Sequence, residues 1–95
     1  MSGEDQRAEV EVEVSNRMGL HTRPAKAFVE TANRFASRIE VHNGDLVANG
    51  KSIMGLMSLL APQGTHLVVT AQGPDAAEAV QALADLVRQR FGEAE

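Results

Sequence analysis

Residues 8–14 alternate strictly between apolar and acidic side chains, and this pattern constrains the fold more than any other feature of the chain. Successive side chains of a β-strand point to opposite faces, so this segment predicts a strand that is buried on one side only. A sheet of such strands keeps one face open, and any helices must share the other face. The alternating residues are Val10, Val12 and Val14 on one face and Glu9, Glu11 and Glu13 on the other.

The hydrophobic period changes after Pro24, where apolar residues recur at the spacing of an amphipathic helix. Proline is tolerated only in the first turn of a helix, because the amides there have no helical partner. The helix is therefore expected to begin at about His21 or Thr22. Its predicted apolar stripe consists of Ala25, Phe28, Val29, Ala32 and Phe35.

Three further segments have the composition of strands. Residues 38–42 alternate, and the turn signal at residues 43–45 leads into an apolar run over residues 46–48, which predicts a hairpin. Residues 65–71 form another run rich in β-branched side chains.

Two more helices are predicted, over residues 52–60 and from about residue 76 onward. Ser52 is expected at the N-terminal end of the first. Asp75 and Glu78 fit a capping box at the start of the second, and Gly92 is placed to terminate it.

The element order is β-α-β-β-α-β-α, without an internal repeat. It predicts an α+β fold, a two-layer open-faced sandwich whose four-stranded antiparallel sheet is covered on one face by three helices. We expect one domain over residues 8–92, preceded by a flexible tail at residues 1–7 and followed by a short tail at residues 93–95.

Composition excludes several classes of function. The 95 residues include no cysteine, which removes disulfides, thiolate nucleophiles and Cys-based zinc sites. Three Phe, no Tyr or Trp, and a net charge of −4 argue against a nucleic-acid-binding domain. No apolar run is long enough to span a bilayer, and the polar N-terminus is not a signal peptide. We therefore expect a cytoplasmic monomer with no cofactor, no metal and no membrane insertion.

The acidic residues avoid two segments of the chain. None falls within residues 14–29 or within residues 46–74. An acidic protein with two segments free of carboxylates can present a local basic face to an acidic partner. From the charges alone, a chance distribution of the acidic residues explains the two segments equally well. The basic residues in these segments are Arg17, Arg23, Lys26 and Lys51.

His21 is the candidate for covalent chemistry. At the start of a helix, unpaired amides and the positive dipole end favour an anion and a neutral imidazole. Such a ring can accept a phosphoryl group if one nitrogen is free and no carboxylate competes, and Arg23 can hold phosphoryl oxygens. The alternative is that His21 is a loop residue or an imperfect cap. His42 and His66 lie on predicted strands without metal-ligand spacing and are interpreted as surface or edge histidines.

The helix predicted over residues 52–60 carries a second candidate surface. Ile53, Met54 and Met57 form an apolar patch beside the core-facing leucines, and flexible methionine suits a surface that binds several partners in turn. The alternative is that both methionines pack inward.

These two segments resemble the signatures of a known family. Gly19-Leu20-His21-Thr22-Arg23-Pro24-Ala25 is similar to the active-site motif of the HPr family, the histidine-containing phosphocarriers of the bacterial phosphotransferase system. The stretch from Lys51 to Leu59 resembles the motif around that family's regulatory serine, and the distance between the two motifs agrees. The resemblance extends over residues 8–92.

The resemblance implies a phosphocarrier rather than an enzyme. His21 would accept a phosphoryl group on Nδ1 from phosphorylated enzyme I and pass it to an enzyme IIA domain in phosphoenolpyruvate-dependent sugar uptake. Arg23 would stabilise the group, supported by Thr22 and Pro24. Ser52 matches the position that HPr kinase phosphorylates. The partner-binding surface would comprise Arg17, Leu20, Lys26, Lys51, Ile53, Met54 and Met57.

Some residues depart from the usual pattern of the family. Gly73-Pro74 and the stretch at residues 60–62 look more like the nitrogen-type branch, which regulates rather than feeds sugar uptake. A nitrogen-type regulatory phosphocarrier is therefore the alternative within the family. A non-covalent interaction module on the same fold is the alternative outside it.

Overall fold

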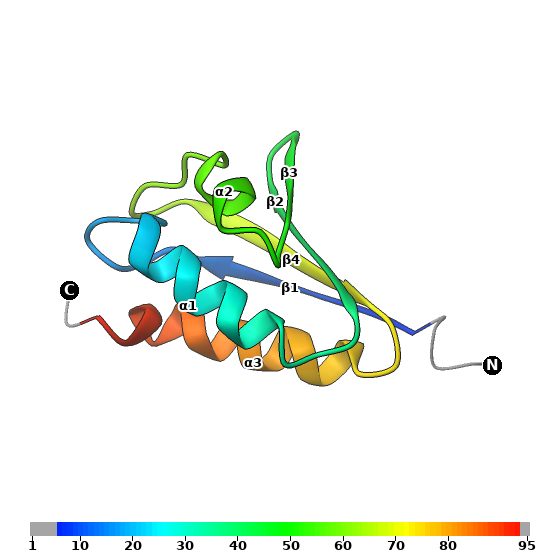
Figure 1. Cartoon of the computed structure of the whole chain (residues 1–95). Coiled ribbons are helices and arrows are strands. Elements are labelled where there is room, and N and C mark those ends of the chain that lie inside the picture. The colour runs from blue at the N-terminus through cyan, green and yellow to red at the C-terminus, as the bar shows by residue number, and fades with distance from the viewer. Residues whose placement is uncertain (1–5, 94–95) are drawn as a thin grey trace.

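The computed structural model describes residues 6–93 and confirms the predicted open-faced α+β sandwich (Figure 1). The predicted order of strands and helices is also the observed one. The elements are β1 (Arg7–Glu13), α1 (Thr22–Ala32), β2 (Arg38–Asn43), β3 (Leu46–Asn49), α2 (Ile53–Met57), β4 (His66–Gln72), α3 (Ala76–Arg88) and the short turn η2 (Arg90–Gly92).

The four strands form one antiparallel sheet in the order β1-β4-β2-β3. At the centre of the sheet, Val69 of β4 is aligned with Val10 of β1 on one side and with Val41 of β2 on the other. The last strand, β4, is therefore inserted between the first two, and every strand contact except the β2–β3 hairpin joins segments that are distant in sequence.

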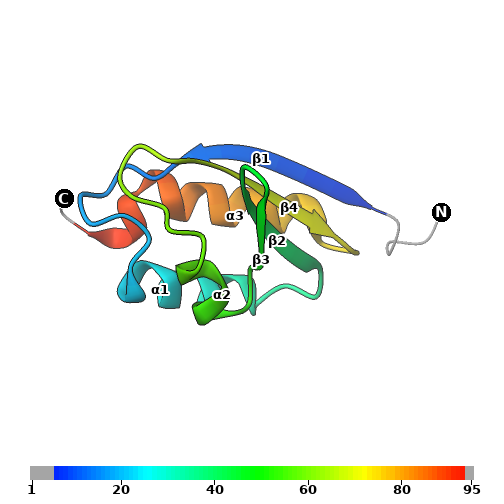
Figure 2. The same ribbon diagram turned by 90° about the horizontal axis from the view of Figure 1, so that it is seen from above.

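The helices cover one face of this sheet, as the one-sided strand pattern requires. Val12, Ile39 and Val69 are each at most 3% exposed and point toward the helices, whereas the glutamates of β1 face solvent. Figures 1 and 2 show α1 and α3 lying side by side beneath the sheet, with α2 next to α1. From the helices, Phe28 and Leu83 complete the core at 2% and 0% exposed.

Helix α1 begins at Thr22, with His21 as its N-cap residue, as the position of Pro24 predicts. Helix α2 is shorter than the predicted residues 52–60. Ser52 caps its start by accepting a hydrogen bond from the Gly55 amide at 3.0 Å, but the helix ends at Met57. The chain then leaves helical geometry, and Leu60 has a φ of 51°.

The predicted capping box at Asp75 and Glu78 is wrong. Asp75 is the N-cap residue of α3, but its side chain makes no cap hydrogen bond. Its carboxylate instead accepts hydrogen bonds from the amides of Ala36 and Ser37, both at 2.9 Å, and from the Ser37 hydroxyl. Asp75 thus ties the loop after α1 to the start of α3.

The fold also starts earlier than the predicted domain boundary at residue 8. Strand β1 begins at Arg7, and the Gln6 carbonyl accepts a hydrogen bond from the Gly73 amide at 2.9 Å. The rest of the predicted N-terminal tail, residues 1–5, lies outside the described residues, as do residues 94–95. Among residues 6–93, no helix has the length and hydrophobicity needed to cross a membrane.

The Asp75 contacts predict a pH dependence of stability. The Ser37 hydroxyl and the Ala36 amide lower the pKa of Asp75 from its ordinary value of 3.8, because they stabilise the carboxylate. A carboxyl group whose pKa is lower in the folded state stabilises the fold above its unfolded pKa, and this stabilisation is lost as the pH falls through the folded value.

We therefore expect Asp75→Asn to lower the urea midpoint at pH 7 and to have little effect once the pH is low enough, below the ordinary value of 3.8, to protonate Asp75 in the folded protein. Urea unfolding of both proteins at several pH values between 2 and 7 measures this difference. A constant difference across that range would contradict the assignment to the Asp75 carboxylate.

Candidate functional site

His21 lies at the N-terminal end of α1, with extended backbone angles of φ −86° and ψ −171°. Its side chain is 35% exposed and makes no cap hydrogen bond to the helix. The amides of Thr22 and Arg23 follow directly and have no preceding helical turn to supply carbonyl acceptors, and Pro24 has no amide hydrogen. Within residues 6–93 these two amides have no hydrogen-bond acceptor, so a half-exposed imidazole stands beside available backbone donors and the positive end of the helix dipole.

The loop before His21 is held against the segment that follows α2. The Leu20 amide donates to the Ala61 carbonyl at 2.9 Å, and the His21 amide donates to the Gly19 carbonyl at 3.0 Å. Gly19 has a φ of 71°, and a Cβ atom at this position would lie 2.5 Å from the Ala61 oxygen and 2.8 Å from the Pro62 Cα. Only glycine fits here, so the loop brings its backbone close to Ala61 and Pro62 and fixes where α1 begins.

Glu93 is the residue of the site that the sequence reasoning missed. Among residues 6–93, the condition that no carboxylate competes is met at His21 Nδ1 but not at Nε2, because Glu93 Oε2 lies 3.2 Å from Nε2. The predicted C-terminal tail therefore includes a residue whose side chain is only 16% exposed and belongs to the site.

A tight turn after α3 brings Glu93 to this position. Helix α3 ends at Arg88, and Arg90, Phe91 and Gly92 follow with φ values of 57°, 57° and 81°. Phe91 is buried in the core at 8% exposed and anchors the turn. The predicted helix-terminating role of Gly92 is thus shared by three consecutive residues in left-handed geometry.

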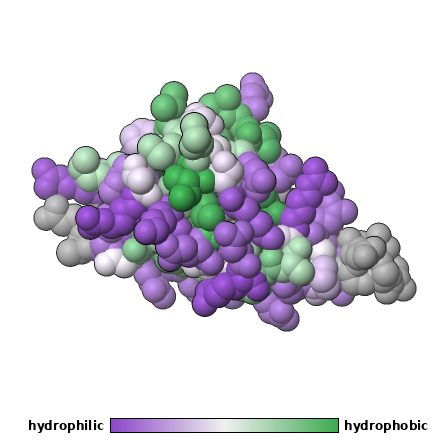
Figure 3. Space-filling view, viewed as in Figure 1, coloured by the Kyte–Doolittle hydropathy of each residue, from purple (hydrophilic) through white to green (hydrophobic). Residues whose placement is uncertain are grey.

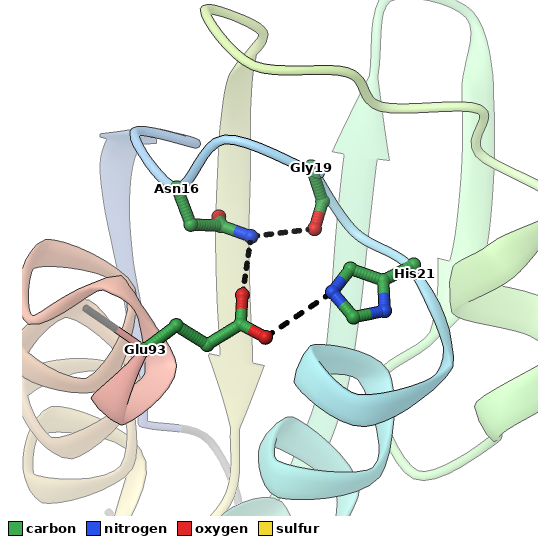
Figure 4. A network of polar contacts seen from close by, with 4 residues as sticks. All are labelled: Asn16, Gly19, His21 and Glu93. Atoms are coloured by element: carbon green, nitrogen blue, oxygen red, sulfur yellow. Dashed lines mark hydrogen bonds and ion pairs between the residues drawn. The ribbon is translucent and has the colours of Figure 1, made fainter. Parts of the chain in front are cut away.

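Asn16 holds the other oxygen of Glu93. Its Nδ2 donates to Glu93 Oε1 at 3.0 Å and to the Gly19 carbonyl at 2.7 Å, and Figure 4 shows the four residues as one network. Asn16 is fully buried, and its Oδ1 has no hydrogen-bond partner within residues 6–93. The two acceptors determine the orientation of this amide, because a flipped amide would place Oδ1 against two oxygens that cannot donate.

The network leaves the two ring nitrogens of His21 in different environments. Nε2 faces Glu93, whereas Nδ1 lies on the side of the ring away from Glu93 and has no hydrogen-bond partner among the described residues (Figure 4). A carboxylate can only accept, so in the neutral ring the proton belongs on Nε2. Nδ1 then carries the lone pair and is the nucleophilic atom.

The predicted basic residues differ in their surroundings. Arg17, Arg23 and Lys26 are exposed. Lys51 is half-buried, and its Nζ donates to the Phe35 carbonyl at 2.8 Å, so part of its hydrogen-bonding capacity is used within the fold.

Only some residues of the predicted apolar patch are exposed at the surface. Met54 is 83% exposed and Met57 is 40% exposed, so the alternative that both methionines pack inward is wrong. Ile53 is half-buried, and Leu20 is 7% exposed and belongs to the core. Leu60, at 79% exposed, extends the surface, and Figure 3 shows hydrophobic residues gathered over α2 and the loop after it. We call Met54, Met57 and Leu60 the α2 patch.

The α2 patch lies next to the start of α1, since the Thr22 hydroxyl donates to Met57 Sδ at 3.7 Å. His42 and His66 lie elsewhere, on β2 and β4, with side chains 32% and 62% exposed. Within residues 6–93, no group of His, Asp and Glu side chains is arranged to hold a metal ion.

Comparison with known proteins yields matches over most of the chain. A family model described as PTS HPr component phosphorylation site matches residues 8–89. A Phosphocarrier protein HPr from Neisseria meningitidis serogroup A is 46% identical over 84 residues, which are 88% of this chain and 94% of that protein. The HPr-like protein Crh from Bacillus subtilis is 46% identical over 78 residues, which are 82% of this chain and 92% of that protein.

The fold agrees with solved structures of the same group. The crystal structure of HPr from Thermoanaerobacter tengcongensis matches with a TM-score of 0.89 at 46% identity, covering 93% of this chain and 99% of that one. That of a phosphocarrier protein HPr from Bacillus anthracis matches with a TM-score of 0.80 at 42% identity, covering 85% of this chain and 96% of that one.

The contacts at Gly19 predict a strong effect of a single added methyl group. We expect Gly19→Ala to destabilise the protein by more than the ~1 kcal/mol typical of an unfavourable glycine substitution, because strain at positive φ and a clash with backbone atoms add together. Gly44→Ala is the matched control, since Gly44 has a φ of 59° and open space around the added Cβ. Equal losses in chemical denaturation would show that the close approach at Gly19 contributes nothing.

Proposed function

The chain belongs to the HPr family of phosphotransferase-system phosphocarriers, and from this premise we propose that His21 accepts a phosphoryl group on Nδ1 from phosphorylated enzyme I and passes it to enzyme IIA in phosphoenolpyruvate-dependent sugar uptake. Members of this family carry a group between enzymes and are not themselves catalysts. The His21 reaction, its two partners and the sugar pathway are the proposal.

The main support for the proposal is the environment of the His21 ring. His21 stands at the start of α1 with Nε2 engaged by Glu93 and Nδ1 without a partner among residues 6–93. A phosphoryl group on Nδ1 would lie near the unpaired amides of the first turn, where the helix dipole favours an anion. The exposed Arg23 guanidinium, two residues along the chain, can add a bidentate contact to the phosphoryl oxygens.

The free energy that a helix N-terminus contributes suits a phosphoryl group that is bound and then released. A helix N-terminus stabilises an anion by about 0.3–1 kcal/mol at an exposed position. Since ~1.4 kcal/mol corresponds to one decade in an equilibrium constant, this contribution shifts a transfer equilibrium by less than tenfold. The site therefore favours the phosphoryl group without trapping it.

We propose that the partners dock on the α2 patch and the basic residues around it. Met54 and Met57 offer flexible apolar contacts beside His21, and Arg17 and Lys26 add positive charge. A partner with an acidic rim and an apolar centre would match this surface. Leu20 is excluded from the contact surface by its burial, and Lys51 contributes mainly through its charge.

Ser52 is the proposed site of regulation. It is the N-cap residue of α2, the helix that carries Met54 and Met57, and its hydroxyl accepts a hydrogen bond from the Gly55 amide. A phosphate at this position adds about −1.5 to −2 charges at a helix start, so it is compatible with the helix. It would repel an acidic partner and thereby slow the phosphorylation of His21.

The first test is intact mass spectrometry after incubation with enzyme I, magnesium and phosphoenolpyruvate. We expect one added phosphoryl group on the wild-type chain, lost in acid, and none on His21→Ala. Circular dichroism of His21→Ala checks that the variant is folded. A wild-type chain that gains no mass beside a known carrier that does would reject the carrier function and favour a non-covalent interaction module.

The second test introduces a charge at Ser52. We expect Ser52→Asp to slow phosphoryl transfer from enzyme I about tenfold relative to Ser52→Asn at low salt, because the added charge opposes an acidic partner. The difference should shrink at 1 M salt, where the Debye length falls to about 3 Å. Ser52→Asn is the matched control, because it keeps a capping oxygen without the charge, and equal rates for the two variants at low salt would reject electrostatic control at this position.

A further inference from the structure

Glu93 bridges two parts of the site that are distant in sequence. One carboxylate oxygen contacts His21 Nε2 at 3.2 Å, and the other accepts from Asn16 Nδ2 at 3.0 Å. Because Asn16 is fully buried and also binds the Gly19 carbonyl, the carboxylate is fixed in orientation relative to the loop that carries His21 (Figure 4). This arrangement matches a carboxylate that orients a histidine through the nitrogen not used in chemistry.

We propose that Glu93 is a positioning residue for His21, an inference that rests on the proposed carrier function. It keeps the proton of the neutral ring on Nε2, so that Nδ1 presents its lone pair. It then pairs with the ring when the ring becomes positively charged. Glu93 does not contact the phosphoryl group; it acts through the imidazole.

The transfer step shows why a carboxylate is useful at this position. The Nδ1 lone pair forms the new N–P bond while the bond between phosphorus and the donor nitrogen breaks, and that electron pair leaves with the donor. Nε2 keeps its proton throughout, so the phosphorylated imidazole carries a positive charge. The Glu93 carboxylate lies next to that charge and stabilises it through a charge-assisted hydrogen bond.

The same carboxylate also limits how long the group is held. Glu93 repels the negatively charged phosphoryl group while it attracts the cationic ring, and the ring is closer. Both effects are moderated by solvent, since the His21 side chain is 35% exposed. We therefore expect a modest shift of the transfer equilibrium rather than an all-or-none effect.

The test compares three variants by ¹⁵N NMR of the imidazole and by the phosphoryl-transfer equilibrium with enzyme I. In the wild type, the neutral His21 ring should give the ¹⁵N shifts of a single Nε2–H tautomer. Glu93→Ala should give averaged shifts from two tautomers and about a two- to fivefold smaller equilibrium constant for phosphorylation. Glu93→Gln offers a single acceptor oxygen, which the buried Asn16 Nδ2 should occupy, so that its NH₂ group faces Nε2; this variant should lose both the single Nε2–H tautomer and the equilibrium effect.

Glu95→Ala is the matched control, because it removes the same charge two residues further along the chain, outside the described residues. If Glu93→Ala matches Glu95→Ala in both ring shifts and equilibrium, the positioning role is rejected while the carrier function stands. If no variant, the wild type included, accepts a phosphoryl group, the carrier function is rejected. The ring spectra alone then decide whether Glu93 sets the tautomer.

Discussion

The one-sided burial of the sheet determines where the site lies. Because the strands bury a single face, α1 and α3 must pack next to each other on that face, and Figure 1 shows them running in opposite directions. The positive end of α1 and the C-terminal end of α3 therefore meet at the same end of the molecule. His21 occupies the first of these ends and Glu93 follows the second, so their 3.2 Å contact is a consequence of the layer arrangement.

The elements that depend on local pattern were predictable. The alternation in β1 and the position of Pro24 fix one strand and the start of one helix through steric and hydrogen-bonding rules that act within a few residues. The prediction failed where a local signal competes with a distant partner. Asp75 has the type and spacing of a capping residue, but the amides of Ala36 and Ser37 offer its carboxylate better contacts across the fold.

The same distinction between local signals and distant partners applies to the candidate site. The position of His21 at the start of α1 could be predicted from Pro24, and a helix start attracts anions through its unpaired amides. The contact of Glu93 could not be predicted from Glu93 itself, since it is a charged residue between Gly92 and Ala94 in a segment expected to be a tail. The available signal was Phe91, an apolar side chain near the C-terminus that has to be buried and so brings the following residues against the core. Leu20 shows the converse error, because its motif suggests a surface role whereas its contacts with the core bury it.

A carrier differs from an enzyme in that both of its covalent states must be nearly equal in free energy. In the proposed carrier, weak and opposing interactions at His21 would be an advantage: the helix start and Arg23 would favour the phosphoryl group, while Glu93 would stabilise the ring and repel the group bound to it. Each of these contributions is of the order of ~1 kcal/mol at a half-exposed site. A fully buried ion pair at His21 would hold one state too strongly, because removing a partner from a buried pair costs several times more. The partial exposure of the imidazole is thus as much a part of the site as the residues that contact it.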